Sequence, residues 1–266
     1  MPRIFNRKIY ENELIMSKRK YVICFCCLFF VCNLIAQTPF KQIPSTPNFN
    51  IENTYLHFPS GDSTALNEFF NFLDNYILKG EEAKFTILHM GGSHIQAGIF
   101  SNRMRSNLLS LCPNFVSARG LIFPFSAAKT NNPISFKTTY TGKWDYAKNT
   151  QRDPKYPLGL AGMCISPEDS NATLKIAMRN NDSISFDFST IRLLGYCDSN
   201  WIFPTLLYND TILVNGVFDS LTSSYTFEVD QHIDSFMLVF NSIADTLWEN
   251  FYLRGFVLDN HFSGLS

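Results

Sequence analysis

The sequence has little charge and no excess of either sign. Only 17% of its 266 residues are charged, and 22 basic against 23 acidic residues leave a formal net charge of −1. This balance excludes the strongly basic surface that nucleic-acid binding requires. Glycine (13) and proline (12) occur at ordinary frequencies, which excludes collagen-like and low-complexity chains.

Loops that bind phosphates or dinucleotides are also missing. No Gly-Lys-Ser or Gly-Lys-Thr follows the pair Gly91-Gly92, and the sequence contains no G-x-G-x-x-G. Nucleotide binding is therefore not expected. What is present is 45% hydrophobic residues, with 26 Phe and 11 Tyr. This composition predicts one or two globular domains with a substantial core.

The first 36 residues have the layout of a secretory signal peptide. A basic patch, residues 18–20, precedes an apolar run, residues 21–36, that is shorter than the roughly 20 residues of a membrane-spanning helix. Met16, just before the patch, is an alternative start of translation. We expect an exported protein that is periplasmic, at the cell surface or secreted, with no stable membrane span after signal cleavage.

Four of the seven cysteines lie in the predicted signal peptide. The others, Cys112, Cys164 and Cys197, can form at most one internal bridge, and their pairing stays open. Their spacing matches no zinc motif, and the five histidines do not cluster with them. The sequence therefore predicts no metal and no cofactor.

The segment from residue 62 to residue 111 predicts a helix, a strand, a glycine turn and a second helix. Residues 62–80 carry apolar side chains three and four positions apart, and residues 85–89 form an apolar run of strand length. After the turn, a helical pattern runs from about Ile95 to Leu111 and ends before Pro113. This order predicts the beginning of an α/β layered domain.

From about Ser135 onward the pattern changes to short alternating runs separated by turn residues. These runs show no helical period and predict a β-sandwich of roughly 120 residues. Asn209-Asp210 is the expected loop of a hairpin. The predicted strands are residues 135–140, 174–178, 183–188, 191–196, 205–208, 211–214, 223–228, 235–241 and 251–258.

Ser93 is the main candidate for chemistry. It follows two glycines between a predicted strand and a predicted helix, which is where open α/β sheets bind ligands. A serine hydroxyl becomes a nucleophile only with a base, normally a histidine, within hydrogen-bond reach. The same residues also fit a plain helix start, because serine is a preferred N-cap residue.

Residues 87–96, ILHMGGSHIQ, resemble the first block of the SGNH (GDSL-type) hydrolases. The similar subgroup consists of exported carbohydrate and peptidoglycan O-acetylesterases, whose block reads Gly-Asp-Ser-His. Residues 119–124, 140–144 and 251–266 also resemble stretches of these enzymes. The resemblance implies that Ser93 is the nucleophile, that its backbone N–H helps to hold the oxyanion, and that a β-rich, carbohydrate-module-like segment interrupts the hydrolase domain.

The sequence departs from the subgroup in two places. The Asp of the block is Gly92 here, and the base pair Asp-x-x-His of the family occurs nowhere in the sequence. Of the family's catalytic set only Ser93 transfers. We therefore expect a truncated, split or degenerate esterase that is incomplete or inactive as this chain alone.

The predicted fold class is α/β plus β, a partial SGNH-type doubly wound domain interrupted by a β-sandwich insertion. The expected order is a signal peptide (1–36), the N-terminal part of the hydrolase-like domain (37–130), the β-sandwich module (131–250), and a strand that re-enters the hydrolase domain before the chain ends (251–266).

Two functions follow as hypotheses. The first is ester hydrolysis that removes acetyl groups from envelope or extracellular polysaccharide or from peptidoglycan. The alternative is a non-catalytic exported module that binds carbohydrate or another envelope protein. Neither hypothesis involves nucleic acid.

Further substrate contacts are expected from Gly92, His94, Trp144 and Trp201, with Tyr146 and Tyr196 as companions of the two tryptophans in a stacking platform for sugars. A buried place in the core is the alternative for these aromatic residues. His89 is expected to be packed. Arg103 and Arg105 either meet a carboxylate or an acidic sugar, or lie on a solvated helix face.

Overall fold

The computed structural model describes residue 58 and residues 61–79, 84–111, 116–180, 185–199, 201–209, 211–242, 249–262 and 264–265. All of them belong to one compact unit, Phe58–Ser266. The predicted signal peptide and Cys112 lie outside the described residues.

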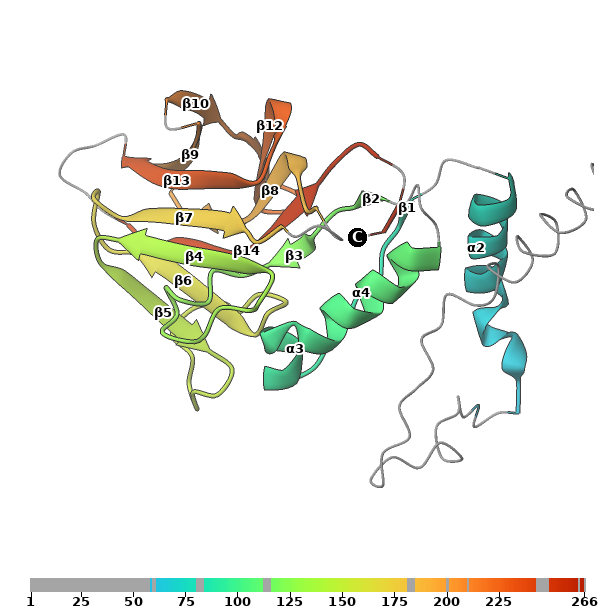
Figure 1. The fold of residues 1–266 in the computed structure, drawn as a ribbon. Coiled ribbons are helices and arrows are strands. Elements are labelled where there is room, and N and C mark those ends of the chain that lie inside the picture. Colours follow the sequence, from blue (N-terminus) through green and yellow to red (C-terminus); the bar gives the residue numbers. More distant parts are fainter. Residues whose placement is uncertain are drawn as a thin grey trace, which may run out of the picture. The chain divides into compact units, whose positions relative to one another are not determined.

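Two antiparallel sheets contain most of the strands of the described chain (Figure 1). The smaller sheet has the strand order β10 (Ile212–Asn215), β9 (Ile202–Tyr208), β13 (Ser235–Ser242), β7 (Thr173–Met178) and β4 (Phe136–Thr141). The larger has the order β11 (Val217–Asp219), β12 (Ser224–Ile233), β8 (Phe188–Cys197), β14 (Phe251–Asp259), β6 (Met163–Pro167) and β5 (Trp144–Lys148), and β3 (Gly120–Ile122) pairs with β14 beside this path.

The two sheets pack face to face through phenylalanine rings. Phe236 and Phe240 of β13 alternate with less buried residues, so their side chains point to the same face of the smaller sheet. The ring of Phe236 lies 5.5 Å from that of Phe256 in β14, and the ring of Phe240 lies 5.1 Å from that of Phe251. The alternating runs of the sequence therefore form a β-sandwich, as predicted, and its core lies between the sheets.

The helical segment is built from short elements. It comprises η2 (Ser63–Leu66), α2 (Asn67–Lys79), α3 (Ser93–Ala97) and α4 (Ile99–Leu111). The helix expected after the glycine turn is divided in two at Gly98, whose φ of 74° is in the left-handed region and whose N–H donates to the carbonyl of Ile95.

A small parallel sheet accompanies these helices. It has the order β1 (Lys84–Phe85), β15 (Gly264–Leu265) and β2 (Val116–Ser117), and each strand pairs over only two residues. The ring of Phe85 lies 5.1 Å from that of Phe69 and 5.0 Å from that of Phe72 in α2. These contacts pack α2 against β1.

The prediction of a partial doubly wound α/β domain is wrong. A doubly wound domain needs parallel strands long enough to support helices on both faces. Here the parallel pairing covers two residues per strand, and residues 86–89, which were expected to continue the strand, are not in a strand. Leu88 and Met90 are largely exposed, at 61% and 69%. Residues 251–259, expected to re-enter the hydrolase domain, form β14 of the larger antiparallel sheet.

Replacing Phe236 by alanine tests the dependence of the sandwich on its inter-sheet rings. Phe236 is 2% exposed and contacts Phe188 and Phe256 of the other sheet, so Phe236→Ala should lower the free energy of unfolding by about 3–5 kcal/mol. The matched control is Leu221→Ala, at a side chain that is 95% exposed, with an expected change within about 0.5 kcal/mol. Urea unfolding measures both, and equal losses would contradict this account.

Candidate functional site

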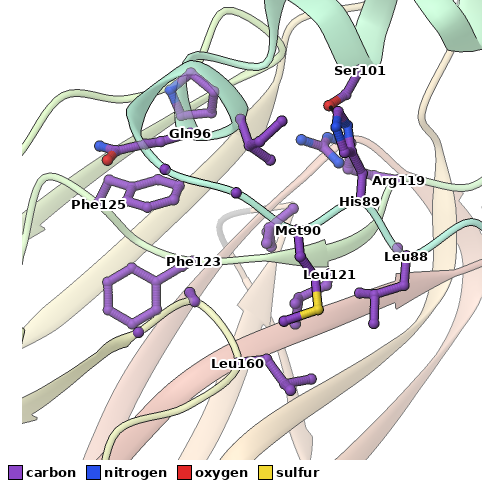
Figure 2. Close-up of a pocket in the computed structure, with 18 of the residues that line it drawn as sticks. Leu88, His89, Met90, Gln96, Ser101, Arg119, Leu121, Phe123, Phe125 and Leu160 are labelled. Atoms are coloured by element: carbon purple, nitrogen blue, oxygen red, sulfur yellow. Dashed lines mark hydrogen bonds between the residues drawn. The ribbon is translucent and has the colours of Figure 1, made fainter. Parts of the chain in front are cut away.

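A cavity of about 630 Å³ lies where the helical segment meets the larger sheet (Figure 2). Its wall is formed by the loop after β1, by α3 and α4, by residues 119–125 around β3, and by parts of the loop between β5 and β6. Most lining side chains are apolar, including Leu121, Phe123 and Phe125. Volume and lining are those of a site for a small organic group or a sugar unit.

Ser93 is exposed and lines this cavity as the first residue of α3. Gly92 is the N-cap, and its carbonyl accepts hydrogen bonds from the N–H groups of Ile95 and Gln96 at 3.0 and 3.2 Å. Since α3 has only five residues, its dipole adds little at its start. The turn itself, rather than a helix dipole, therefore places Ser93 on the cavity wall.

No histidine of the described residues forms a hydrogen bond with Ser93. His94 is exposed and does not line the cavity. The ring of His232 stacks on Phe262 with 4.8 Å between centroids, and His261 faces Glu228. The base that a serine nucleophile requires is thus not among these groups.

His89 forms a pair with Ser101 that the sequence did not reveal. Nδ1 of His89 lies 2.9 Å from Oγ of Ser101, and both residues line the cavity (Figure 2). The ring of Phe100 lies 5.4 Å from the imidazole. The expectation of a packed histidine missed this partner, because the loop after β1 meets α4 only in the folded chain.

Two arginines complete the polar part of the cavity wall. Arg105 comes from α4 and Arg119 directly precedes β3, and both are half-buried. Burial lowers the pKa of Arg105. Burial, and then the neighbouring charge of Arg105, lower the pKa of Arg119 to about 9. Arg119 therefore stays charged at neutral pH. Arg103 is exposed and does not line the cavity.

The predicted tryptophan platform is not assembled at the cavity. Trp144 is 7% exposed, its Nε1–H donates to the carbonyl of Thr141 at 2.8 Å, and its ring packs edge-on against Phe240. Trp201 is 37% exposed just before β9, and neither tryptophan lines the cavity. Trp144 is thus a core residue.

A different aromatic group lies on the outer face of the larger sheet. Tyr196 and Tyr252 are directly opposed in β8 and β14, and their rings are 5.3 Å apart. The ring of Tyr156 lies 5.7 Å from that of Tyr252, and all three residues are half-buried. We call Tyr156, Tyr196 and Tyr252 the tyrosine cluster. The guanidinium of Arg254 lies over Tyr196 at 5.3 Å.

Over the part of the chain that the structure describes, no group of three or more His, Cys, Asp or Glu residues is arranged to hold a metal. Cys164 and Cys197 are buried free thiols, and burial raises the pKa of Cys164 to about 12. None of the described helices combines the length and the apolarity needed to cross a membrane.

Comparisons with known proteins add no relative. No family model matches the sequence, and a search of curated proteins finds no match. The resemblance of residues 87–96 to SGNH hydrolases stays a prediction from the sequence.

The turn before Ser93 predicts opposite outcomes for its two glycines. A Cβ atom on Gly91 would lie 2.5 Å from Cγ1 of Ile95, whereas one on Gly92 would meet nothing within 4 Å. Gly91→Ala should thus force Ile95 off its rotamer and cost about 0.5–1.5 kcal/mol. Gly92→Asp, which introduces a preferred N-cap residue, should leave stability unchanged or raise it by a few tenths of a kcal/mol. Urea unfolding of both variants checks the ranking, and the reverse order would refute this geometry.

Proposed function

We propose that this chain acts in ester hydrolysis of the SGNH type, binding an acylated carbohydrate in the cavity and presenting Ser93 as nucleophile. The observation that carries the proposal is the exposed position of Ser93 on the cavity wall, directly after a two-glycine turn. The similarity of residues 87–96 to the first block of the family supports the same role. Envelope or extracellular polysaccharide and peptidoglycan are the proposed substrates.

The chemistry assigned to Ser93 is acyl transfer. Oγ attacks the ester carbonyl while a base takes its proton, and the carbonyl oxygen becomes an oxyanion beside the backbone N–H of Ser93. The C–O bond to the sugar then breaks, the leaving alkoxide takes the proton from the base, and water hydrolyses the acyl-serine in a second cycle. No described histidine is hydrogen-bonded to Ser93, so the base is not assigned to any of them.

Hydrolysis of p-nitrophenyl acetate with added imidazole tests the nucleophile without the missing base. A base positioned in the active site accelerates proton transfer by about 10²–10⁴-fold. Free imidazole is not positioned, so it should raise the Ser93-dependent rate by only roughly tenfold. Ser93→Ala should show only the rate of imidazole in buffer. Ser110→Ala is the control, because Ser110 is exposed on α4 away from the cavity.

Two outcomes would reject the role of Ser93. The first is an equal imidazole-dependent rate in wild type and Ser93→Ala. The second is a loss of turnover in Ser101→Ala but not in Ser93→Ala, which would assign the nucleophile to the Ser101–His89 pair. Circular dichroism of each variant establishes that the fold is intact before rates are compared.

Carbohydrate binding without catalysis is a second candidate function, favoured by the tyrosine cluster. Exposed aromatic faces stack on sugar rings. The hydroxyl of Tyr156 donates to Asp145 at 2.8 Å and that of Tyr252 donates to Asp198 at 3.2 Å. Two carboxylates thus flank the aromatic surface and can accept hydrogen bonds from sugar hydroxyls.

Retention on insoluble peptidoglycan and on acetylated xylan tests this second function. Loss of one stacking ring in Tyr252→Ala should weaken retention by roughly three- to tenfold, and Ser93→Ala should leave it unchanged. Trp201→Ala tests the platform expected from the sequence and should have little effect. Equal retention of wild type and Tyr252→Ala on both polymers would count against the tyrosine cluster.

A further inference from the structure

Among the described residues, the two arginines of the cavity wall have no acidic partner. No Asp or Glu of the described chain lines the cavity. Three ion pairs are found among the described residues, Lys84–Asp259, Lys155–Asp145 and His261–Glu228, and none involves Arg105 or Arg119. Two half-buried positive charges thus line the cavity with no counter-ion among the described residues, whereas charges that lose contact with water are normally paired.

Much of the hydrogen-bonding capacity of both guanidinium groups is unused. Each guanidinium carries five N–H donors. Within the described chain, Nε of Arg119 donates to Oγ of Ser135 at 3.2 Å, and Nη1 of Arg105 makes a long contact of 3.5 Å to Oδ1 of Asn102. Nε of Arg105 is buried with no partner there. Both residues line the cavity, so hydrogen-bonding capacity that the described chain does not use lies at its wall.

Aromatic rings hold both guanidinium groups in place. Arg105 lies over the ring of Phe186 at 5.5 Å, and Arg119 lies over the ring of Phe136 at 5.6 Å. Phe186 and Phe136 are themselves buried, at 2% and 1% exposure. Such stacking orients a guanidinium but leaves its charge in place. The site is therefore built before a ligand arrives.

We infer that Arg105 and Arg119 form an anion-binding site that holds an oxyanion group of the ligand, a carboxylate or a phosphate, inside the cavity. Paired guanidinium groups match such groups because their N–H donors form charge-assisted, often bidentate hydrogen bonds. The apolar remainder of the cavity then receives the uncharged part of the ligand. Burial lowers the pKa of both arginines, and for Arg119 the neighbouring charge of Arg105 adds to this effect.

The inference names a substrate class for the proposed function. If Ser93 acts on an acylated carbohydrate, that carbohydrate carries a carboxylate or a phosphate near its ester. This statement about the substrate rests on the proposed function, whereas binding of the anion does not. The two are therefore measured separately.

Calorimetric titration of the full chain carrying Ser93→Ala tests the anion site without any contribution from hydrolysis. The probes are D-galacturonate, neutral D-galactose and inorganic phosphate at constant ionic strength. We expect galacturonate or phosphate to bind at least about tenfold more tightly than galactose, as charge-assisted hydrogen bonds imply. Preference for galacturonate assigns a carboxylated ligand, and preference for phosphate assigns a phosphorylated one.

Arginine variants locate the site on the cavity wall. In the same background, Arg119→Met and Arg105→Met should each weaken binding of the preferred anion by about tenfold or more. Arg103→Met is the matched control, because it removes the same charge from an exposed position on the same helix, and it should bind as the parent does. Thermal unfolding checks that each variant is folded.

Three results would overturn the anion site. They are binding of galactose as tight as that of both anions, no binding of either anion, and equal binding by Arg103→Met and both cavity variants. Hydrolysis plays no part in these readouts, so a failure of Ser93 to act as nucleophile leaves them unaffected.

Discussion

The packing of aromatic rings between the two antiparallel sheets is the contact on which the other parts of the structure depend. β14 is central to it, because the side chains of Phe251 and Phe256 meet β13 across the core while its edge pairs with β3. At Gly255 the carbonyl of Ile122 comes within 2.9 Å of where a Cβ atom would lie, so only glycine permits this close approach of β3. β3 in turn fixes the residues before it, including Arg119. The sandwich core thus positions one wall of the cavity.

The sandwich was predictable because its signal is local. When apolar and polar residues alternate along a strand, the apolar side chains all point to the same face of the sheet. β12 and β13 lie where such alternating runs were predicted, at residues 223–228 and 235–241. The parallel sheet was not predictable in the same way. Whether the apolar run at residues 85–89 becomes a strand depends on neighbours distant in sequence, and β15 offers a partner over only two residues. A local pattern of strand, turn and helix was therefore overextended to a doubly wound domain.

The candidate site likewise combines features that adjacent residues predict with contacts between segments distant in sequence. The glycine turn before Ser93 could be predicted from the sequence alone, because the residues that favour a turn are adjacent in the chain. The pairing of His89 with Ser101, and the approach of Arg105 to Arg119, join separate segments and could not be read in this way. One signal was nevertheless present. Ser101, Met104, Arg105 and Leu108 recur at helical spacing and all line the cavity, whereas Arg103 lies on the opposite side of α4. Helical periodicity therefore distinguishes Arg105 from Arg103, although the sequence analysis assigned the same alternatives to both.

A contribution to folding stability does not explain why Arg105 and Arg119 lie in the cavity wall. Burying a guanidinium without a counter-ion opposes folding, and the proximity of a second one adds repulsion. Stacking on Phe186 and Phe136 offsets this by only about 0.5–2 kcal/mol each, and the hydrocarbon stems of both residues could be replaced by a neutral side chain such as methionine. A wall built for packing alone would therefore lack these charges. An oxyanion would remove both penalties at once, since it supplies the missing charge and the missing acceptors. If the proposed anion site is correct, the two arginines restrict what the cavity binds more sharply than its apolar lining does.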